Sequence, residues 1–119
     1  MSYDICFAVK VEGVDKYIPV GDCNANTTWN VREMIVNSTG LPWYNCANNG
    51  FCKDVIPYIE HGLAELKNHP ERYKKYEAPN GWGTVESTIR FFEDIIKAWR
   101  DLKKWEDADF LNVITFWIT

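Results

Sequence analysis

The sequence predicts an α+β domain: a three-stranded, mostly antiparallel sheet, made of an N-terminal hairpin and a C-terminal strand, with three to four helices packed on one face. Three observations predict it. Strand-like alternation opens the chain, helical segments with apolar stripes fill its middle, and a β-branched, aromatic segment closes it. The length of 119 residues and the 46% hydrophobic share fit a single domain over residues 1–119.

The first predicted strand covers residues 3–11, where apolar and polar side chains alternate. Its predicted buried face consists of Tyr3, Ile5, Phe7, Val9 and Val11. A period of two is typical of a strand with one buried face. Residues 12–15 form a predicted turn around Gly13, and residues 17–20 return as a second strand, so a hairpin is expected.

A first helix is predicted from residue 31 to residue 38, after a loop over residues 21–26. Asn30 is the expected N-cap, Glu33 completes a capping box, and Gly40 ends the helix. The expected core contacts are Trp29, Met34 and Ile35. The next ten residues, 41–50, are rich in turn-forming side chains and are predicted to be irregular.

A second helix is predicted over residues 54–68, with Asp54 as its cap and Pro57 in its first turn. Its apolar stripe consists of Val55, Ile59, Leu63 and Leu66. Pro70 restarts a short helix over residues 71–76.

The strongest helix breaker is the segment 78–83, after which Thr84 is expected to cap a long helix over residues 85–106. The inner stripe of this helix consists of Ile89, Phe92, Ile96, Trp99 and Leu102. Its exposed face is expected to carry the ion pairs Arg90–Asp94 and Lys97–Asp101. The last segment, 110–119, is apolar on both faces, which favours a strand in the sheet interior or at an interface.

The net charge of −4 disfavours non-specific DNA binding, which depends on many lysine and arginine contacts to phosphates. The N-terminus shows no signal peptide, and no apolar run approaches the roughly 18 residues of a membrane span. We therefore expect a cytoplasmic protein without a membrane partner, and we expect no cofactor.

Four cysteines, Cys6, Cys23, Cys46 and Cys52, are expected to be free thiols in that compartment. Their spacing does not include the short Cys-x₂₋₄-Cys pair of most zinc sites, so no metal is expected. The standard phosphate-loop, hydrolase and metalloprotease motifs are absent from the sequence. One enzymatic hypothesis stays open, in which His61 acts with Cys46 or Cys52 as a nucleophile.

Basic and aromatic side chains interleave between residues 71 and 84. The candidate binding residues are Arg72, Tyr73, Lys74, Lys75, Tyr76, Trp82 and Thr84. Such a mixture suits phosphate binding with base stacking, and the helix start at Thr84 adds free N–H groups. The alternative is that Tyr73, Tyr76 and Trp82 hold the loop to the core while the lysines stay in solvent.

The aromatic share of 15% is large for one small core. Several rings fall in the two turn-rich loops, 41–50 and 78–83, among them Trp43, Tyr44 and Trp82. Tryptophan and tyrosine are preferred interface anchors, because they bury a large area at low entropic cost. These three side chains are therefore candidate contacts for a protein partner.

Five short motifs resemble a group of small accessory proteins of Firmicutes phages and prophages. They read YDICF at 3–7, VKVEG at 9–13, IEHG at 59–62, YKKY at 73–76 and NGWGT at 80–84. The resemblance covers about residues 3–15 and 52–95 and contributes no catalytic residues. It implies a non-enzymatic, phage-encoded protein of the host bacterial cytoplasm, of a kind that often counters bacterial defence.

The resulting hypothesis is an anti-CRISPR-like inhibitor that binds a bacterial immune protein through loop aromatics. The alternative is a nucleotide sponge, a homo-oligomer that sequesters a cyclic-nucleotide or ADP-ribose-type immune signal with Arg72, Lys74, Lys75 and Trp82.

Overall fold

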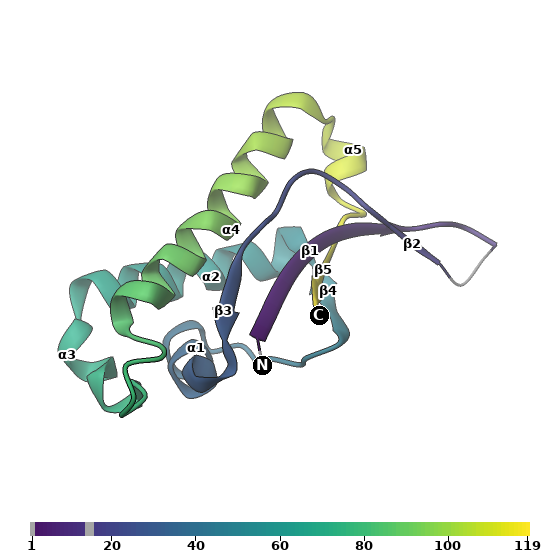
Figure 1. The fold of residues 1–119 in the computed structure, drawn as a ribbon. Coiled ribbons are helices and arrows are strands. Elements are labelled where there is room, and N and C mark those ends of the chain that lie inside the picture. The colour runs from purple at the N-terminus through teal and green to yellow at the C-terminus, as the bar shows by residue number, and fades with distance from the viewer. Residues whose placement is uncertain (1, 14–15) are drawn as a thin grey trace.

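The computed structural model describes residues 2–13 and 16–119, and it contains a five-stranded antiparallel sheet with helices beside it (Figure 1). The strands are β1 (Ser2–Lys10), β2 (Tyr17–Pro19), β3 (Asn26–Thr28), β4 (Ala47–Phe51) and β5 (Thr115–Ile118). Their order is β2-β1-β5-β4, and β3 pairs with β1. The predicted α+β class is confirmed, whereas the predicted count of three strands is too small.

The helices follow the predicted sequence of elements with shifted boundaries. They are η1 (Trp29–Val31), α1 (Arg32–Thr39), α2 (Cys52–Asn68), α3 (Pro70–Tyr73), η2 (Lys74–Tyr76), α4 (Val85–Trp105) and α5 (Ala108–Leu111). None of the helices in the described ranges has the length and apolar character that crossing a bilayer requires.

Strand β1 shows the predicted alternation, with Tyr3, Ile5 and Phe7 buried against the helices. The hairpin with β2 is also confirmed, with Lys10 opposite Tyr17. The predicted turn between them includes Gly13, which has a φ of 82°, while its residues 14 and 15 lie outside the described residues.

Strand β3 was not predicted, because its three residues are polar and too short for a periodic signal. It pairs with the start of β1, where Tyr3 lies opposite Thr27. A hydrogen bond of 2.6 Å between two side chains, from Asn26 Nδ2 to Asp4 Oδ1, supports the pairing. Strands β2 and β3 thus occupy one edge of β1, with residues 20–25 between them.

Strand β5 lies between β1 and β4, so the expectation of a strand in the sheet interior is confirmed. The predicted strand over 110–119 is too long, because Asp107 Oδ1 accepts the Phe110 N–H at 2.8 Å and starts α5 there. Its partner β4 comes from the segment predicted as irregular. A register shift between Asn48 and Phe51 breaks its ladder, which explains why no alternation marks it in the sequence.

Helix α1 ends at Gly40 as predicted, with a left-handed φ of 79°. Its start differs from the prediction, because η1 precedes it and Thr28, not Asn30, is the cap: Thr28 Oγ1 accepts the Asn30 N–H at 3.3 Å. This change of cap frees the Asn30 side chain for a contact described below.

Helix α2 begins at Cys52, two residues before the predicted start, so Asp54 is not its cap. The Cys52 N–H donates to the Ile114 carbonyl at 2.9 Å, which joins the helix directly to β5. Pro57 therefore lies inside the helix and leaves the Lys53 carbonyl without its usual donor. The predicted stripe holds: Val55, Ile59 and Leu66 are buried, and Leu63 packs partly buried against the core.

Helix α4 is the longest helix and begins at the predicted cap, Thr84. Its predicted inner stripe is buried except for Ile89, which is half-buried, and Phe91 and Ile95 extend that stripe. The ion pair Lys97–Asp101 is confirmed at 3.8 Å. The predicted pair Arg90–Asp94 is not among the ion pairs of the described residues.

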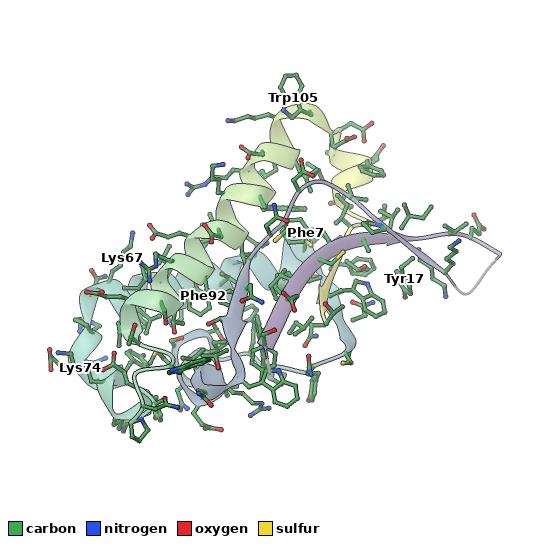
Figure 2. All side chains as sticks on the ribbon, viewed as in Figure 1. Phe7, Tyr17, Lys67, Lys74, Phe92 and Trp105 are labelled. Carbon is green, nitrogen blue, oxygen red and sulfur yellow. The ribbon has the colours of Figure 1, made fainter. Side chains whose placement is uncertain are left out.

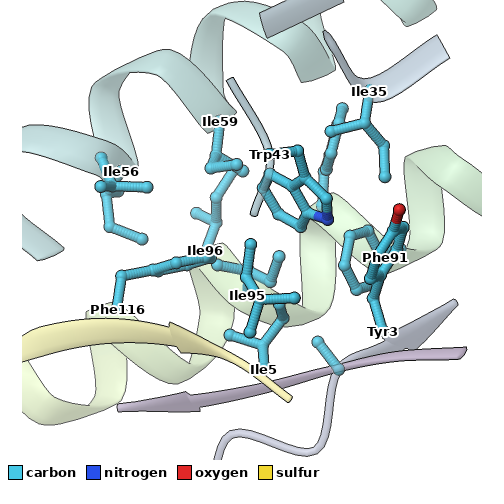
Figure 3. Close-up of a cluster of buried hydrophobic side chains, with 14 of the residues drawn as sticks. Tyr3, Ile5, Ile35, Trp43, Ile56, Ile59, Phe91, Ile95, Ile96 and Phe116 are labelled. Carbon is cyan, nitrogen blue, oxygen red and sulfur yellow. The ribbon is translucent and has the colours of Figure 1, made fainter. Parts of the chain in front are cut away.

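The core lies between the sheet and α1, α2 and α4, and an indole occupies its centre (Figure 3). Trp43 is 2% exposed and lies edge-on to Tyr3, Phe91 and Phe116, at centroid distances of 5.9, 6.1 and 5.8 Å. The other face of the sheet carries its own aromatic pair, Tyr17 and Trp117, at 4.4 Å.

Candidate functional site

The loop over residues 78–83 is closed on itself by three hydrogen bonds. The Ala78 N–H donates to the Gly83 carbonyl at 3.2 Å, and the Gly81 N–H donates to the Ala78 carbonyl at 3.0 Å. Asn80 Oδ1 accepts the Trp82 N–H at 3.0 Å. The backbone of Trp82 is therefore held in place, while its side chain is 71% exposed.

The same loop is fixed against the segment between β3 and α1. Asn30 Nδ2 donates to the Trp82 carbonyl at 3.1 Å. Gly83 has a φ of +110°, and a Cβ there would lie 2.5 Å from Val31 Cγ1 and 3.0 Å from Thr28 Cγ2. Only glycine permits this approach, so the position of Trp82 depends on the neighbouring Gly83.

The second turn-rich loop, 41–50, is joined to the same segment. Arg32 Nη2 donates to the Trp43 carbonyl at 3.3 Å. The next residue, Tyr44, is 58% exposed, and its N–H and carbonyl bond the Asn49 side chain at 3.1 and 2.8 Å. The expectation that Trp43 is a surface anchor is wrong, because the chain turns its indole into the core.

Trp29 lies within that joining segment and is 36% exposed, so it is not the core residue that we expected. Its Nε1 donates to the Ser2 carbonyl at 2.8 Å, and its ring lies 6.0 Å from that of Tyr3. We call the surface formed by Trp29, Asn30, Arg32, Tyr44 and Trp82 the loop end. Figure 1 shows the loop before α4 beside α1, at the end of the molecule that holds the N-terminus.

An exposed tryptophan also occurs at the opposite end of α4. Trp105 is 84% exposed and lies at the tip of the helix, far from Lys74 and the α3 region (Figure 2). No hydrogen bond of its side chain occurs among the described residues. Trp105 therefore provides a tryptophan of similar exposure outside the loop end.

Two of the three basic side chains of the 71–84 stretch, those of Arg72 and Lys74, have acidic partners within the chain. Arg72 Nη1 lies 3.9 Å from Glu65 Oε2, and Lys74 Nζ lies 3.1 Å from Glu71 Oε1. Lys75 is exposed, with its ammonium group 5.2 Å from the centre of the Tyr76 ring. These pairs lower the positive potential that a phosphate ligand would need.

Tyr73 is buried and Tyr76 is half-buried, with ring centroids 6.3 Å apart. Burial, then the nearby Glu65 carboxylate, raises the pKa of Tyr73. Tyr73 is therefore no surface contact, and both tyrosines anchor the turn to the core. The alternative in which Tyr73, Tyr76 and Trp82 hold the loop to the core is thus confirmed for the tyrosines and wrong for Trp82, which is 71% exposed.

The start of α4 already holds a carboxylate from its own chain. Glu77 Oε2 accepts the Val85 N–H at 2.8 Å. Thr84 and Ser87 form a capping box, with bonds of 3.0 Å from the Ser87 N–H to Thr84 Oγ1 and 2.9 Å from the Thr84 N–H to Ser87 Oγ. A bound anion would compete with Glu77 for the positive end of the helix.

A cavity of about 540 Å³ lies between the end of α2, α3 and the start of α4. It is lined by Leu66, Lys67, Pro70, Glu71, Lys74, Glu77, Thr84, Val85, Glu86 and Ile89. Carboxylates outnumber ammonium groups in this lining, and Lys67 is paired with Glu93 at 3.3 Å. The cavity beneath the candidate nucleotide site is thus acidic in balance.

His61 lies on the exposed face of α2, with Nε2 4.0 Å from Glu65 Oε1. Cys52 lies about 13 Å further along the same helix and is buried in the core. Burial raises the pKa of the Cys52 thiol well above its ordinary range, so its reactive thiolate is disfavoured. Cys46 is exposed. The described residues hold no cluster of side chains suited to a metal ion.

Sequence reasoning located Tyr44 and Trp82 and missed the residues that connect their loops, Trp29, Asn30 and Arg32. Asn30 looked like a helix cap, and only the shift of the cap to Thr28 shows its bond to the Trp82 carbonyl. Comparison with protein families, curated proteins and solved structures finds no match.

Proposed function

We propose that this chain is a non-enzymatic phage or prophage accessory protein that inhibits a bacterial defence system by binding one of its proteins, in an anti-CRISPR-like manner. The loop end is the proposed binding surface. The observation that carries the proposal is Trp82, whose ring is 71% exposed on a backbone fixed by Asn80 and Asn30.

A fixed exposed tryptophan favours binding, because little conformational entropy is lost when a partner covers it. Trp29 and Tyr44 add aromatic area: Trp29 is held by its bond to the Ser2 carbonyl, and Tyr44 follows Trp43, whose carbonyl accepts a bond from Arg32. Tryptophan, tyrosine and arginine are the residue types in which interface energy concentrates. The phage context comes from the sequence resemblance, which supports a defence protein as the partner.

The proposal is tested by phage plating on bacteria that carry a defence system and express the chain. We expect the wild-type chain to restore plaques and Trp82→Ala to lose most of that effect. Trp105→Ala is the matched control, since it removes an equally exposed indole at the other end of α4. Thermal unfolding checks that both variants are folded.

The double variant Lys74→Glu/Lys75→Glu separates this proposal from the nucleotide sponge. A protein-binding loop end predicts that this variant inhibits defence as the wild type does. Loss of inhibition in the lysine variant would contradict the proposal and favour sequestration of a nucleotide, because both lysines belong to the pocket of the sponge and neither belongs to the loop end.

A further inference from the structure

A groove of about 370 Å³ runs from Trp82 along the first turns of α4 beside β3. Its lining includes Thr28, Trp82, Ser87, Arg90 and Asp94. One end of the groove lies at the loop end, because Trp82 belongs to both. A partner that covers Trp82 therefore meets this groove next.

Arg90 supplies the cation of this groove, and no acid of the described residues pairs with it. Arg32 pairs with Glu33 at 3.5 Å and Arg72 with Glu65 at 3.9 Å, whereas Arg90 has no such contact. It follows Ser87 by three residues, so it lies on the same face of α4, about one turn beyond the capping box.

Asp94 is the one acid of the groove lining, and it lies at the end opposite Trp82. It also lines a separate hollow of about 230 Å³ with Asp22, Asn24 and Lys97. Along α4, from its start, the groove therefore presents the Trp82 ring, then the Arg90 guanidinium and then the Asp94 carboxylate. An incoming acidic group is attracted at Arg90 and repelled at Asp94.

We infer that the end of this groove next to Trp82 receives an acidic segment of the partner protein, with a carboxylate on the Arg90 guanidinium, away from Asp94, and an adjacent apolar side chain on the Trp82 ring. This inference rests on the proposed function and names the chemistry of the partner at that site. The planar guanidinium suits a carboxylate, which accepts two parallel N–H bonds from it.

The test is a selection of random displayed dodecapeptides on the immobilised full chain, followed by affinity measurements on selected peptides made by synthesis. We expect wild-type protein to enrich peptides with Asp or Glu next to an aromatic or aliphatic residue. Arg90→Glu should bind those peptides about tenfold more weakly or worse, as the loss of one charge-assisted contact implies. Arg90→Lys should keep part of the affinity, because it keeps the charge and loses the planar fork.

Arg100→Glu is the matched control. Arg100 is exposed on α4 outside the groove, and its replacement by Glu changes the net charge as much as Arg90→Glu does. Peptides that need Trp82 but are not acidic, peptides that bind Arg90→Glu and wild type alike, or peptides that lose as much affinity for Arg100→Glu as for Arg90→Glu overturn this inference and leave the proposed function standing. A library that yields no Trp82-dependent peptide counts against both. Acidic peptides that need Trp82 and Arg90 but not Arg100 support both.

Discussion

The two turn-rich loops of this chain, 41–50 and 78–83, share a composition but place their tryptophans oppositely. Trp43 is 2% exposed among the core rings, whereas Trp82 is 71% exposed at the loop end. Both loops are held by side chains of the same short segment, Arg32 for the first and Asn30 for the second. Turn-forming neighbours therefore indicate an irregular backbone and do not indicate which way a large side chain points.

The difference has a physical cause in what each loop connects. The first loop links α1 to β4 across the open end of the core, and the Trp43 ring fills the space between Tyr3, Phe91 and Phe116. The second loop closes on itself through Asn80 and contacts the core through Gly83 against Val31, without a large side chain. A loop that spans a core contributes to that core, and a self-closed loop exposes its largest side chain.

Replacing Trp43 should have the largest effect on stability. We expect Trp43→Ala to lower the free energy of unfolding by about 3–5 kcal/mol, because it leaves a cavity at the centre of the core. Trp82→Ala should change it by no more than about 0.5 kcal/mol, as for an exposed surface side chain. Urea denaturation followed by circular dichroism measures both.

Trp43→Phe sharpens that result. The Trp43 Nε1 atom is buried with no hydrogen-bond partner, so the phenyl ring removes an unsatisfied donor as well as volume. Trp43→Phe should therefore lower the free energy of unfolding clearly less than Trp43→Ala does. Equal losses of unfolding free energy for Trp43→Ala and Trp82→Ala would show that the two tryptophans do not differ in burial as described.

The Gly83 position tests how strongly the second loop is held. Gly83→Ala should lower the free energy of unfolding by about 1–3 kcal/mol more than Gly81→Ala. Both glycines have a positive φ, but the new Cβ meets Val31 Cγ1 at 2.5 Å at position 83 and open space at position 81. Thermal unfolding of the two variants makes the comparison, and equal losses would show that the loop is not held against Val31.

Much of the fold was predictable, and the failures have local causes. Period-two alternation located β1, and the stripe of α4 marked its core face, because both elements are long and half-buried. Strands β3 and β4 were not predicted from the sequence. Strand β3 (Asn26–Thr28) has only three residues, all polar, and the pairing of β4 (Ala47–Phe51) is broken by a register shift. Pairing with β1 and β5 creates these strands, and such long-range pairing leaves no local pattern.

The candidate site was predictable in part. Tyr44 and Trp82 are exposed as expected, whereas Trp43, in the same kind of loop, is buried, and Trp29, expected in the core, is 36% exposed. The junction of the two loops at Asn30 and Arg32 depends on distances across the fold. The basic stretch was visible in the sequence, but the pairing of Arg72 with Glu65 and of Lys74 with Glu71 was not.

Two cysteines at the first loop differ in burial in the same way as Trp43 and Trp82. Cys46 is exposed and Cys52 is buried, where burial raises its pKa well above the ordinary range. Because the thiolate is the reacting form, iodoacetamide at about pH 8 should modify Cys46 in the folded protein and Cys52 only after unfolding. Peptide mass spectrometry assigns the sites, and labelling of Cys46 alone should change the free energy of unfolding by no more than about 0.5 kcal/mol.

The smallest expected effect is the change in melting temperature when nucleotides are offered to the second loop and its basic neighbours. Cyclic nucleotides and ADP-ribose should leave the melting temperature unchanged, because Glu77 occupies the start of α4 and Lys74 is paired with Glu71. A ligand that binds the folded state tightly raises the melting temperature with its concentration. A clear rise with any of these nucleotides would contradict the assignment of this region to protein binding.

The most direct test of the loop end is site-specific photo-crosslinking in phage-challenged bacteria that carry the defence system. A benzoyl-phenylalanine replaces Trp82 in one variant and Trp105 in the other, so that the probe has similar exposure at the two ends of α4. The account predicts a crosslink to a defence protein from position 82 and none from position 105. A crosslink from position 105 alone, equal crosslinks from both positions, or none from either would contradict the assignment of the loop end as the binding surface.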